Sequence, residues 1–203
     1  MKKFIVVILL LLPVLASAQS RSYLGISAGI TIPSSPSDFK TYWTSSFNLG
    51  LDYEKPVSDM FGVGGELNYA SFALDKGAVF GNSNANVTGG SFNAVQLLAV
   101  GKICDYNSIN SVSPYGRIGI GLSLTSFDDI KNGSNGNVIL KGSSENGLGV
   151  MLAAGVQFNL QSGSKVSVEG SYRVNNRPSD SVNNRPGDSF NGILLDVGYH
   201  FGL

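Results

Sequence analysis

Residues 148–158 read Leu-Gly-Val-Met-Leu-Ala-Ala-Gly-Val-Gln-Phe. Every second residue from Leu148 to Phe158 is apolar, whereas glycine and glutamine occupy several of the positions between them. Side chains in a β-strand point alternately to its two faces, so a period of two residues is the pattern of a strand. The stretch therefore predicts a strand with one apolar face and one face that includes small and polar residues.

The same alternation predicts seven further strands. They lie at residues 24–30, 47–54, 61–69, 95–103, 117–124, 166–173 and 193–201. Within residues 95–103, the apolar side chains of Leu98 and Val100 interrupt the alternation, so the register of this strand is the least well defined of the eight. The chain is therefore predicted to be all-β.

The connections between these segments alternate in length. Residues 55–59 and 161–164 form short connections, 104–113 an intermediate one, and 33–43, 73–91, 125–146 and 174–189 long ones. In an up-and-down arrangement, successive connections lie at opposite ends, so the long loops share one end and the termini lie at the other. This asymmetry is typical of outer-membrane barrels and predicts an eight-stranded antiparallel up-and-down transmembrane β-barrel.

The first residues have the pattern of a secretory signal peptide. Lys2 and Lys3 precede an apolar run over residues 4–12, and the small residues Ala16 and Ala18 precede a cleavage point at Gln19. The apolar run is shorter than the roughly 20 residues that a membrane-spanning helix needs. We therefore predict a signal peptide at residues 1–18 and a barrel domain at residues 19–203.

The non-apolar face of the strands decides between two kinds of barrel. A soluble secreted barrel such as a lipocalin would turn its apolar face inward and expose an outer face that is about 25–35% charged. Here that face carries glycine at Gly25, Gly29, Gly50, Gly62, Gly64, Gly119, Gly121, Gly149, Gly155 and Gly198. Small residues suit the narrow interior of an eight-stranded barrel, so the apolar face is predicted to meet lipid, with the soluble barrel as the alternative.

The charged residues of the predicted strands lie on the same face as these glycines. They are Asp52, Glu54, Glu66, Lys102, Arg117, Glu169, Arg173 and Asp196. A Lys or Arg on the lipid face at mid-membrane would cost roughly 2–4 kcal/mol, which favours the interior. Because unpaired buried charge is costly, these residues are predicted to form a structural cluster in the barrel interior, with Arg117 paired to Glu66 or Glu169.

Aromatic residues on the apolar face form two groups. Tyr53, Phe61, Phe158, Tyr199 and Phe201 lie toward the short turns, and Phe47, Tyr69 and Tyr172 lie toward the long loops. Two such girdles bracket the apolar band of a membrane-spanning barrel, whereas a soluble barrel has no reason to form them.

The last strand, residues 192–201, combines alternating apolar residues with an aromatic residue near its end. Its Leu195, Val197, Tyr199 and Phe201 resemble the terminal strand that outer-membrane barrels present to their assembly machinery. With the signal peptide and the strand at residues 114–122, the chain resembles the small bacterial outer-membrane β-barrel domain proteins. The barrel of outer-membrane protein A and its tail-less relatives are the nearest of these.

The resemblance covers about residues 20 to 203 and implies a location in the bacterial outer membrane. The partners it implies are outer-membrane lipid, periplasmic chaperones and the barrel assembly machinery. Two features depart from the family pattern, since Gly202 and Leu203 follow the terminal aromatic Phe201 and no periplasmic domain follows the barrel. The resemblance therefore implies no cell-wall tether.

Candidate chemical groups are few, because one His and one Cys leave no His/Cys metal site and no internal disulfide. His200 is predicted to be a polar residue of the lumen or interface without partners for acid–base catalysis, and Cys104 an incidental thiol rather than an intermolecular disulfide partner. Asp128 and Asp129, with residues 132–137, could offer oxygen ligands to Ca²⁺, but their spacing favours a flexible surface loop. No catalytic, cofactor-binding or metal-binding residue is predicted.

Residues 174–181 are repeated almost unchanged at 182–189. The repeat is either a tolerated duplication or a recognition loop in which Arg177 and Arg185 contact phosphates or a partner. Basic and acidic residues both number 14, so bulk charge gives no reason to expect nucleic-acid binding. The predicted function is a non-enzymatic outer-membrane protein whose loops serve envelope integrity or surface contact. The alternatives are a narrow, porin-like passive channel and, third, a lipid-modifying enzyme.

Overall fold

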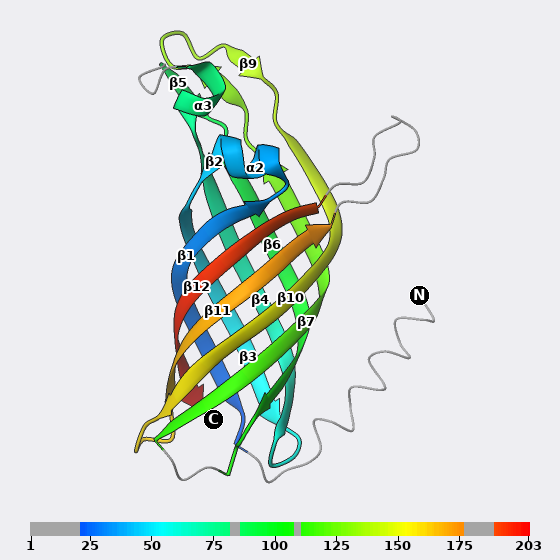
Figure 1. Ribbon diagram of the computed structural model, residues 1–203, viewed down its shortest axis with the longest axis vertical. Coiled ribbons are helices and arrows are strands. Elements are labelled where there is room, and N and C mark those ends of the chain that lie inside the picture. Colours follow the sequence, from blue (N-terminus) through cyan, green and yellow to red (C-terminus); the bar gives the residue numbers. More distant parts are fainter. Residues whose placement is uncertain (1–20, 82–85, 108–110, 177–188) are drawn as a thin grey trace, which may run out of the picture.

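The computed structural model describes residues 21–81, 86–107, 111–176 and 189–203. Within these ranges, eight long antiparallel strands close into one barrel (Figure 1). They are β1 (Tyr23–Ser35), β3 (Ser46–Pro56), β4 (Phe61–Leu74), β6 (Phe92–Cys104), β7 (Val112–Phe127), β10 (Ser143–Asn159), β11 (Lys165–Asn176) and β12 (Ser189–Gly202). Each pairs with the next along the chain, and β12 pairs back to β1, which places Ala28 opposite Val197. The predicted eight-stranded up-and-down barrel is confirmed.

The two ends of the barrel differ as predicted. The C-terminus and the short turns lie at one end, the turn end, and the longer connections lie at the other, the loop end (Figure 1). No helix in the described ranges is long and apolar enough to cross a membrane. The predicted signal peptide, residues 1–18, and most of the duplicated segment, with Arg177 and Arg185, lie outside the described residues.

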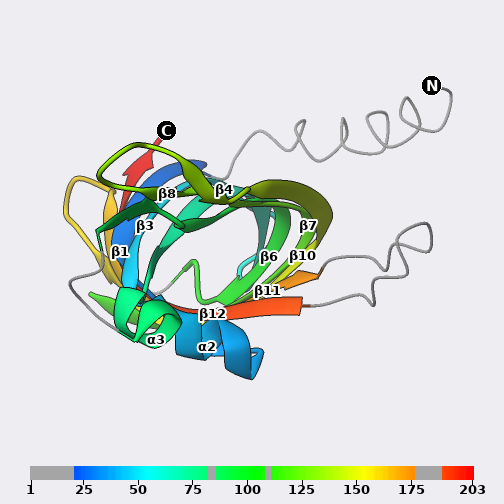
Figure 2. The same ribbon diagram turned by 90° about the horizontal axis from the view of Figure 1, so that it is seen from above.

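The loop end contains elements that the sequence analysis treated only as loops. They are α2 (Ser37–Tyr42), β2 (Trp43–Thr44), α3 (Lys76–Phe80), β5 (Val87–Gly89), β8 (Ile130–Asn132) and β9 (Val138–Leu140). The strands β5, β8 and β9 form a separate three-stranded sheet, in that order, among the described residues. In the view from above, α2 and α3 lie on the same side of the ring of strands (Figure 2).

Several barrel strands are longer than predicted. β3 runs through Pro56, so Lys55 belongs to a strand and not to the turn, and β11 includes the first residues of the predicted last loop up to Asn176. By the alternation of β3, Lys55 lies on the outer face near the turn end, opposite Val63, but it is only 6% exposed, so its side chain lies against neighbouring residues. The prediction that the charged residues of the strands all lie on the inner face did not include Lys55.

The apolar face points outward. Leu49, Ile120 and Leu152 are 52%, 58% and 66% exposed, whereas the lumen side chains Glu66 and Glu169 are 4% and 6% exposed. The opposite orientation, that of a soluble barrel, is therefore wrong for this chain. Alternation along β6 also settles the doubtful register, because Leu97 and Ile103 are exposed while Leu98 and Val100 are buried inside.

Glycine is required at particular positions of the inner face because the neighbouring backbone is too close for a side chain. A Cβ at Gly64 would collide with the carbonyl oxygen of Tyr53, and one at Gly121 with that of Leu97. At Gly101, on the lipid-facing side, the nearest atom to an added Cβ would be Ile118 Cγ2 at 3.8 Å, an ordinary contact. Within the barrel wall, such crowding therefore lies on the inner face, as expected for a barrel of this size.

Candidate functional site: the barrel interior and its loop-end mouth

The centre of the lumen holds a network of charge-assisted hydrogen bonds. Arg117 Nη2 lies 2.5 Å from Glu66 Oε2, and Arg117 Nη1 lies 2.9 Å from Glu169 Oε2. Arg173 Nη2 lies 2.5 Å from the other oxygen of Glu66. The two predicted candidates for pairing with Arg117 therefore both contact it, and Glu66 bridges two guanidinium groups. Because each charge is compensated, the cluster can exist in a buried interior.

The remaining residues of the predicted charge cluster also lie on the inner face. Lys102 Nζ is 2.9 Å from Glu54 Oε2 and donates a 2.8 Å hydrogen bond to Gln157 Oε1. Asp196 and Asp52 are each 6% exposed. Toward the loop end, polar side chains continue the network, because Arg173 Nη1 donates to Gln96 Oε1 at 3.2 Å.

An apolar layer fills another part of the lumen. It consists of Leu98, Val100, Met151 and Ala153. Met151 has no exposed surface, and a Cβ at Gly119 would lie only 3.1 Å from Leu98 Cδ1 and 3.2 Å from Met151 Cε. Glycine at 119 therefore makes room for the larger side chains across from it, and the interior is packed with side chains.

At the loop end, an aromatic cluster closes over the barrel. Phe39 on α2 is 1% exposed, and its ring centre lies 4.9 Å from those of Phe72 and Phe92 and 5.5 Å from those of Trp43 and Phe190. This cluster was not predicted from the sequence. A concentration of aromatic residues at 39–47 was the available signal, but without α2 nothing indicated that Phe39 turns inward.

At the turn end, Tyr106 lies in the connection between β6 and β7. A Cβ at Gly62 would collide with its hydroxyl oxygen, which places the ring against the mouth of the barrel. Burial, together with the nearby carboxylate of Glu54, raises the pKa of the Tyr106 phenol well above its ordinary value. The group therefore remains neutral at physiological pH.

His200 has partners that the sequence analysis did not foresee. Its Nε2 lies 2.9 Å from Ser167 Oγ, and its Nδ1 lies 3.5 Å from Asp52 Oδ2. The order serine, histidine, aspartate is that of hydrolytic triads, so the statement that His200 lacks acid–base partners was wrong. The three residues are only 5–7% exposed, however, and a nucleophilic hydroxyl must be reachable by its substrate. The arrangement satisfies buried polar groups inside the lumen.

Cys104 is the last residue of β6 and is 4% exposed. Gln157 Nε2 lies 3.9 Å from its sulfur atom. A thiol enclosed in this way cannot meet a second chain without opening of the barrel, which favours the incidental thiol over an intermolecular disulfide.

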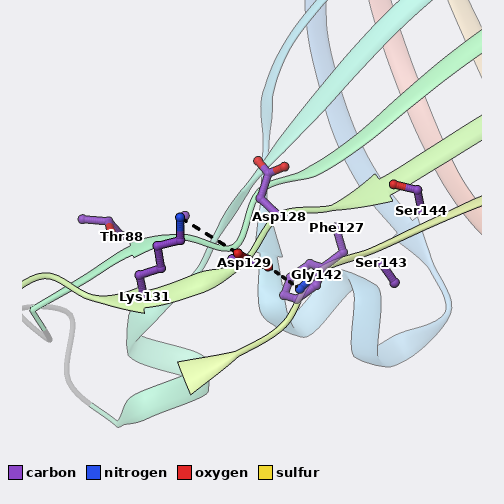
Figure 3. Close-up of a pocket in the computed structure, with 9 residues that line it drawn as sticks. Thr88, Phe127, Asp128, Asp129, Lys131, Gly142, Ser143 and Ser144 are labelled. Carbon is purple, nitrogen blue, oxygen red and sulfur yellow. Dashed lines mark hydrogen bonds and ion pairs between the residues drawn. The ribbon is translucent and has the colours of Figure 1, made fainter. Parts of the chain in front are cut away.

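A polar pocket of about 600 Å³ lies beneath the small sheet at the loop end (Figure 3). Asp129 Oδ1 accepts a 2.7 Å hydrogen bond from the backbone of Gly142, and its other oxygen lies 3.9 Å from Lys131 Nζ. Asp128 Oδ2 accepts from Asn93 at 3.3 Å. These carboxylates therefore brace the loops. Among the described residues, no group of three or more His, Cys, Asp or Glu side chains is arranged to hold a metal ion.

The segment from Asn132 to Asn137, predicted as a flexible surface loop, forms the turn between β8 and β9. Asn132 N donates to Asn137 O at 2.8 Å, and the Asn132 side chain accepts from the backbone of Ser134 at 2.8 Å. The asparagine and glycine residues of this run are thus explained by turn formation.

Comparison with known proteins agrees with this architecture. Residues 4–201 match the model of the outer membrane protein beta-barrel domain family. The chain belongs to this family. The family implies a location in the bacterial outer membrane, where barrels carry their longer loops outside the cell and their short turns in the periplasm. No curated protein sequence matches the chain.

Two solved structures illustrate the fold of this outer-membrane barrel. Neisserial surface protein A is 13% identical with a TM-score of 0.59, over 90% of this chain and 97% of that chain. A major outer membrane protein from Thermus thermophilus is 14% identical with a TM-score of 0.56, over 91% and 100% of the two chains. At these identities the likeness extends to the fold alone.

Proposed function

We propose that this protein is a non-enzymatic membrane anchor that presents a contact surface outside the cell, and that its signal peptide is cleaved after Ala18. The barrel supplies the anchor. The small sheet of β5, β8 and β9 supplies the contact surface, because it is built entirely from the extracellular loops and stands clear of the barrel rim in Figure 1.

The observation that carries the proposal is the exposure of β9. Val138, Ile139 and Leu140 are 51%, 52% and 52% exposed, although they lie outside the membrane. In the described sheet β9 pairs only with β8, so its outer backbone edge is open. Exposed apolar patches on soluble surfaces mark interaction sites, and an open strand edge pairs readily with an extended segment of another chain. The partner that fits is therefore an extended polypeptide with apolar side chains.

We expect Ile139→Asp to weaken this contact roughly tenfold, because a charge replaces an apolar side chain whose burial stabilises a complex by about 1.5–3 kcal/mol. The probe is unfolded, alkylated lactalbumin on beads, which offers extended segments, and the readout is bead binding by cells that display the protein. Val79→Asp, on the exposed face of α3, is the matched control. Equal binding by cells with and without the protein would rule out this role for β9.

The contents of the lumen argue against the passive channel. Ion pairs, the apolar layer and the aromatic cluster occupy an interior that eight strands make only just wide enough for side chains. We therefore expect purified protein in planar lipid bilayers to produce no steady ion conductance, with a general porin as the positive control. Regular conductance steps that scale with the amount of inserted protein would favour the channel over the anchor.

A further inference from the structure

A small cavity of about 170 Å³ lies at the extracellular mouth of the barrel, beside the aromatic cluster. Its walls include the rings of Trp43, Phe92, Phe127 and Phe190, together with Glu145. We call it the aromatic cage. Its residues come from five different strands, β2, β6, β7, β10 and β12, and the fold brings them together at one site.

The rings enclose the aromatic cage at steep angles to one another. Trp43 and Phe127 lie 5.9 Å apart at 85°, and Trp43 and Phe92 lie 6.1 Å apart at 67°. Trp43 is held in place by a 3.1 Å hydrogen bond from its indole Nε1 to the carbonyl oxygen of Gly90. Phe92 is held by its edge contact with Phe39. The walls are therefore fixed before any ligand arrives, which lowers the entropic cost of binding.

The charge of the aromatic cage favours a cation. Glu145 lies opposite Thr125 in the pairing of β7 with β10, on the inner face, and both residues line the cavity together with Ser143. The faces of aromatic rings carry partial negative charge and attract cations within about 6 Å of the ring centre. The rings and the carboxylate of Glu145 therefore both attract a cation. The described residues that line the cavity include no Lys or Arg.

The size and the chemistry of the walls narrow the class of cation. An apolar cavity of about 150 Å³ holds a molecule as large as benzene, so the aromatic cage can enclose a group of that size. Four of the eight described lining residues are aromatic, and a fully methylated ammonium, which needs no hydrogen-bond acceptor, is held by ring faces. We propose that the aromatic cage binds a quaternary ammonium group of the choline type, carried by a free solute or by a lipid headgroup.

The chain supplies its own reporter, because Trp43 is the single tryptophan of the sequence. The full chain, folded in glucoside detergent that carries no choline group, is titrated with choline and with tetramethylammonium while Trp43 fluorescence is followed. The uncharged isostere 3,3-dimethylbutan-1-ol is the comparison ligand. We expect saturable binding of both cations and at least tenfold weaker binding of the isostere.

Two variants test the walls of the aromatic cage without changing Trp43, whose fluorescence reports binding. Phe127→Leu and Glu145→Gln should each weaken choline binding about fivefold to tenfold. The matched controls are Phe80→Leu on α3 and Asp129→Asn in the polar pocket, which should bind as the unaltered protein does. Heat-modifiable migration on a denaturing gel verifies that each variant is folded.

A flotation experiment distinguishes a free solute from a lipid headgroup as the source of the ligand. The protein is first placed in phosphatidylglycerol nanodiscs and is then mixed with vesicles of phosphatidylcholine or of phosphatidylglycerol. Flotation with phosphatidylcholine alone assigns the headgroup, and binding of free choline without flotation assigns the solute; both outcomes support the aromatic cage. Equal affinity for the uncharged isostere, or choline affinity unchanged by Phe127→Leu and Glu145→Gln in folded protein, would overturn the proposal.

Discussion

Replacement of Glu66 by alanine is expected to lower the free energy of unfolding of this barrel by about 3–5 kcal/mol. Glu66 is the shared acceptor for Arg117 and Arg173, and each guanidinium uses a different carboxylate oxygen. Its removal leaves excess positive charge in a lumen where the side chain of Arg173 is only 4% exposed. Urea titration of protein in lipid vesicles, followed through Trp43 fluorescence, measures the change.

The controls for this prediction come from the same network. Glu169→Gln removes one charge but leaves a hydrogen-bond acceptor beside Arg117, so its effect should be clearly smaller than that of Glu66→Ala. Replacement of Glu66 and Arg173 together by methionine removes one carboxylate with one guanidinium, leaves Arg117 paired with Glu169, and should recover much of the lost stability. If Glu66→Ala unfolds within about 1 kcal/mol of the unaltered protein, the ion pairs do not hold the lumen together.

The barrel and the face of each strand could be predicted from the sequence because each follows from local alternation. Leu148 to Phe158 alternates regularly, and the same rule assigns Glu66, Arg117 and Glu169 to one face. Residues on one inner face of a narrow barrel are forced to be near one another, so the pairing of Arg117 could be reduced to two candidates. The structure contains both contacts because Arg117 has two NH₂ groups to donate from.

The loop elements could not be predicted in the same way. β5 and β8 pair Val87 with Asn132, residues far apart in the sequence, and each strand is only three residues long. Such short strands carry no reliable periodicity and depend on contacts between different loops. The partners of His200 were missed for a related reason, because Ser167 and Asp52 are placed beside it only by the registers of three strand pairs, β3 with β1, β1 with β12, and β12 with β11.

The contribution of the membrane to the stability of the barrel is tested by one substitution on the outer face. Leu152 lies near the middle of β10, opposite Ile118 and Tyr172 on the neighbouring strands, and is 66% exposed. We expect Leu152→Arg to destabilise the barrel by about 2–4 kcal/mol in lipid vesicles, since an arginine at the bilayer midplane loses its hydration. Urea titration with Trp43 fluorescence again gives the free energy of unfolding.

Leu140→Arg is the matched control, because Leu140 is 52% exposed but lies on β9, beyond the membrane. A new arginine there remains hydrated and should change the unfolding free energy by less than about 0.5 kcal/mol. The two leucines are alike in chemistry and nearly alike in exposure, so a large difference between the variants can only come from what surrounds each side chain. Equal effects at both sites would mean that Leu152 faces water, and the outward apolar surface would need another explanation.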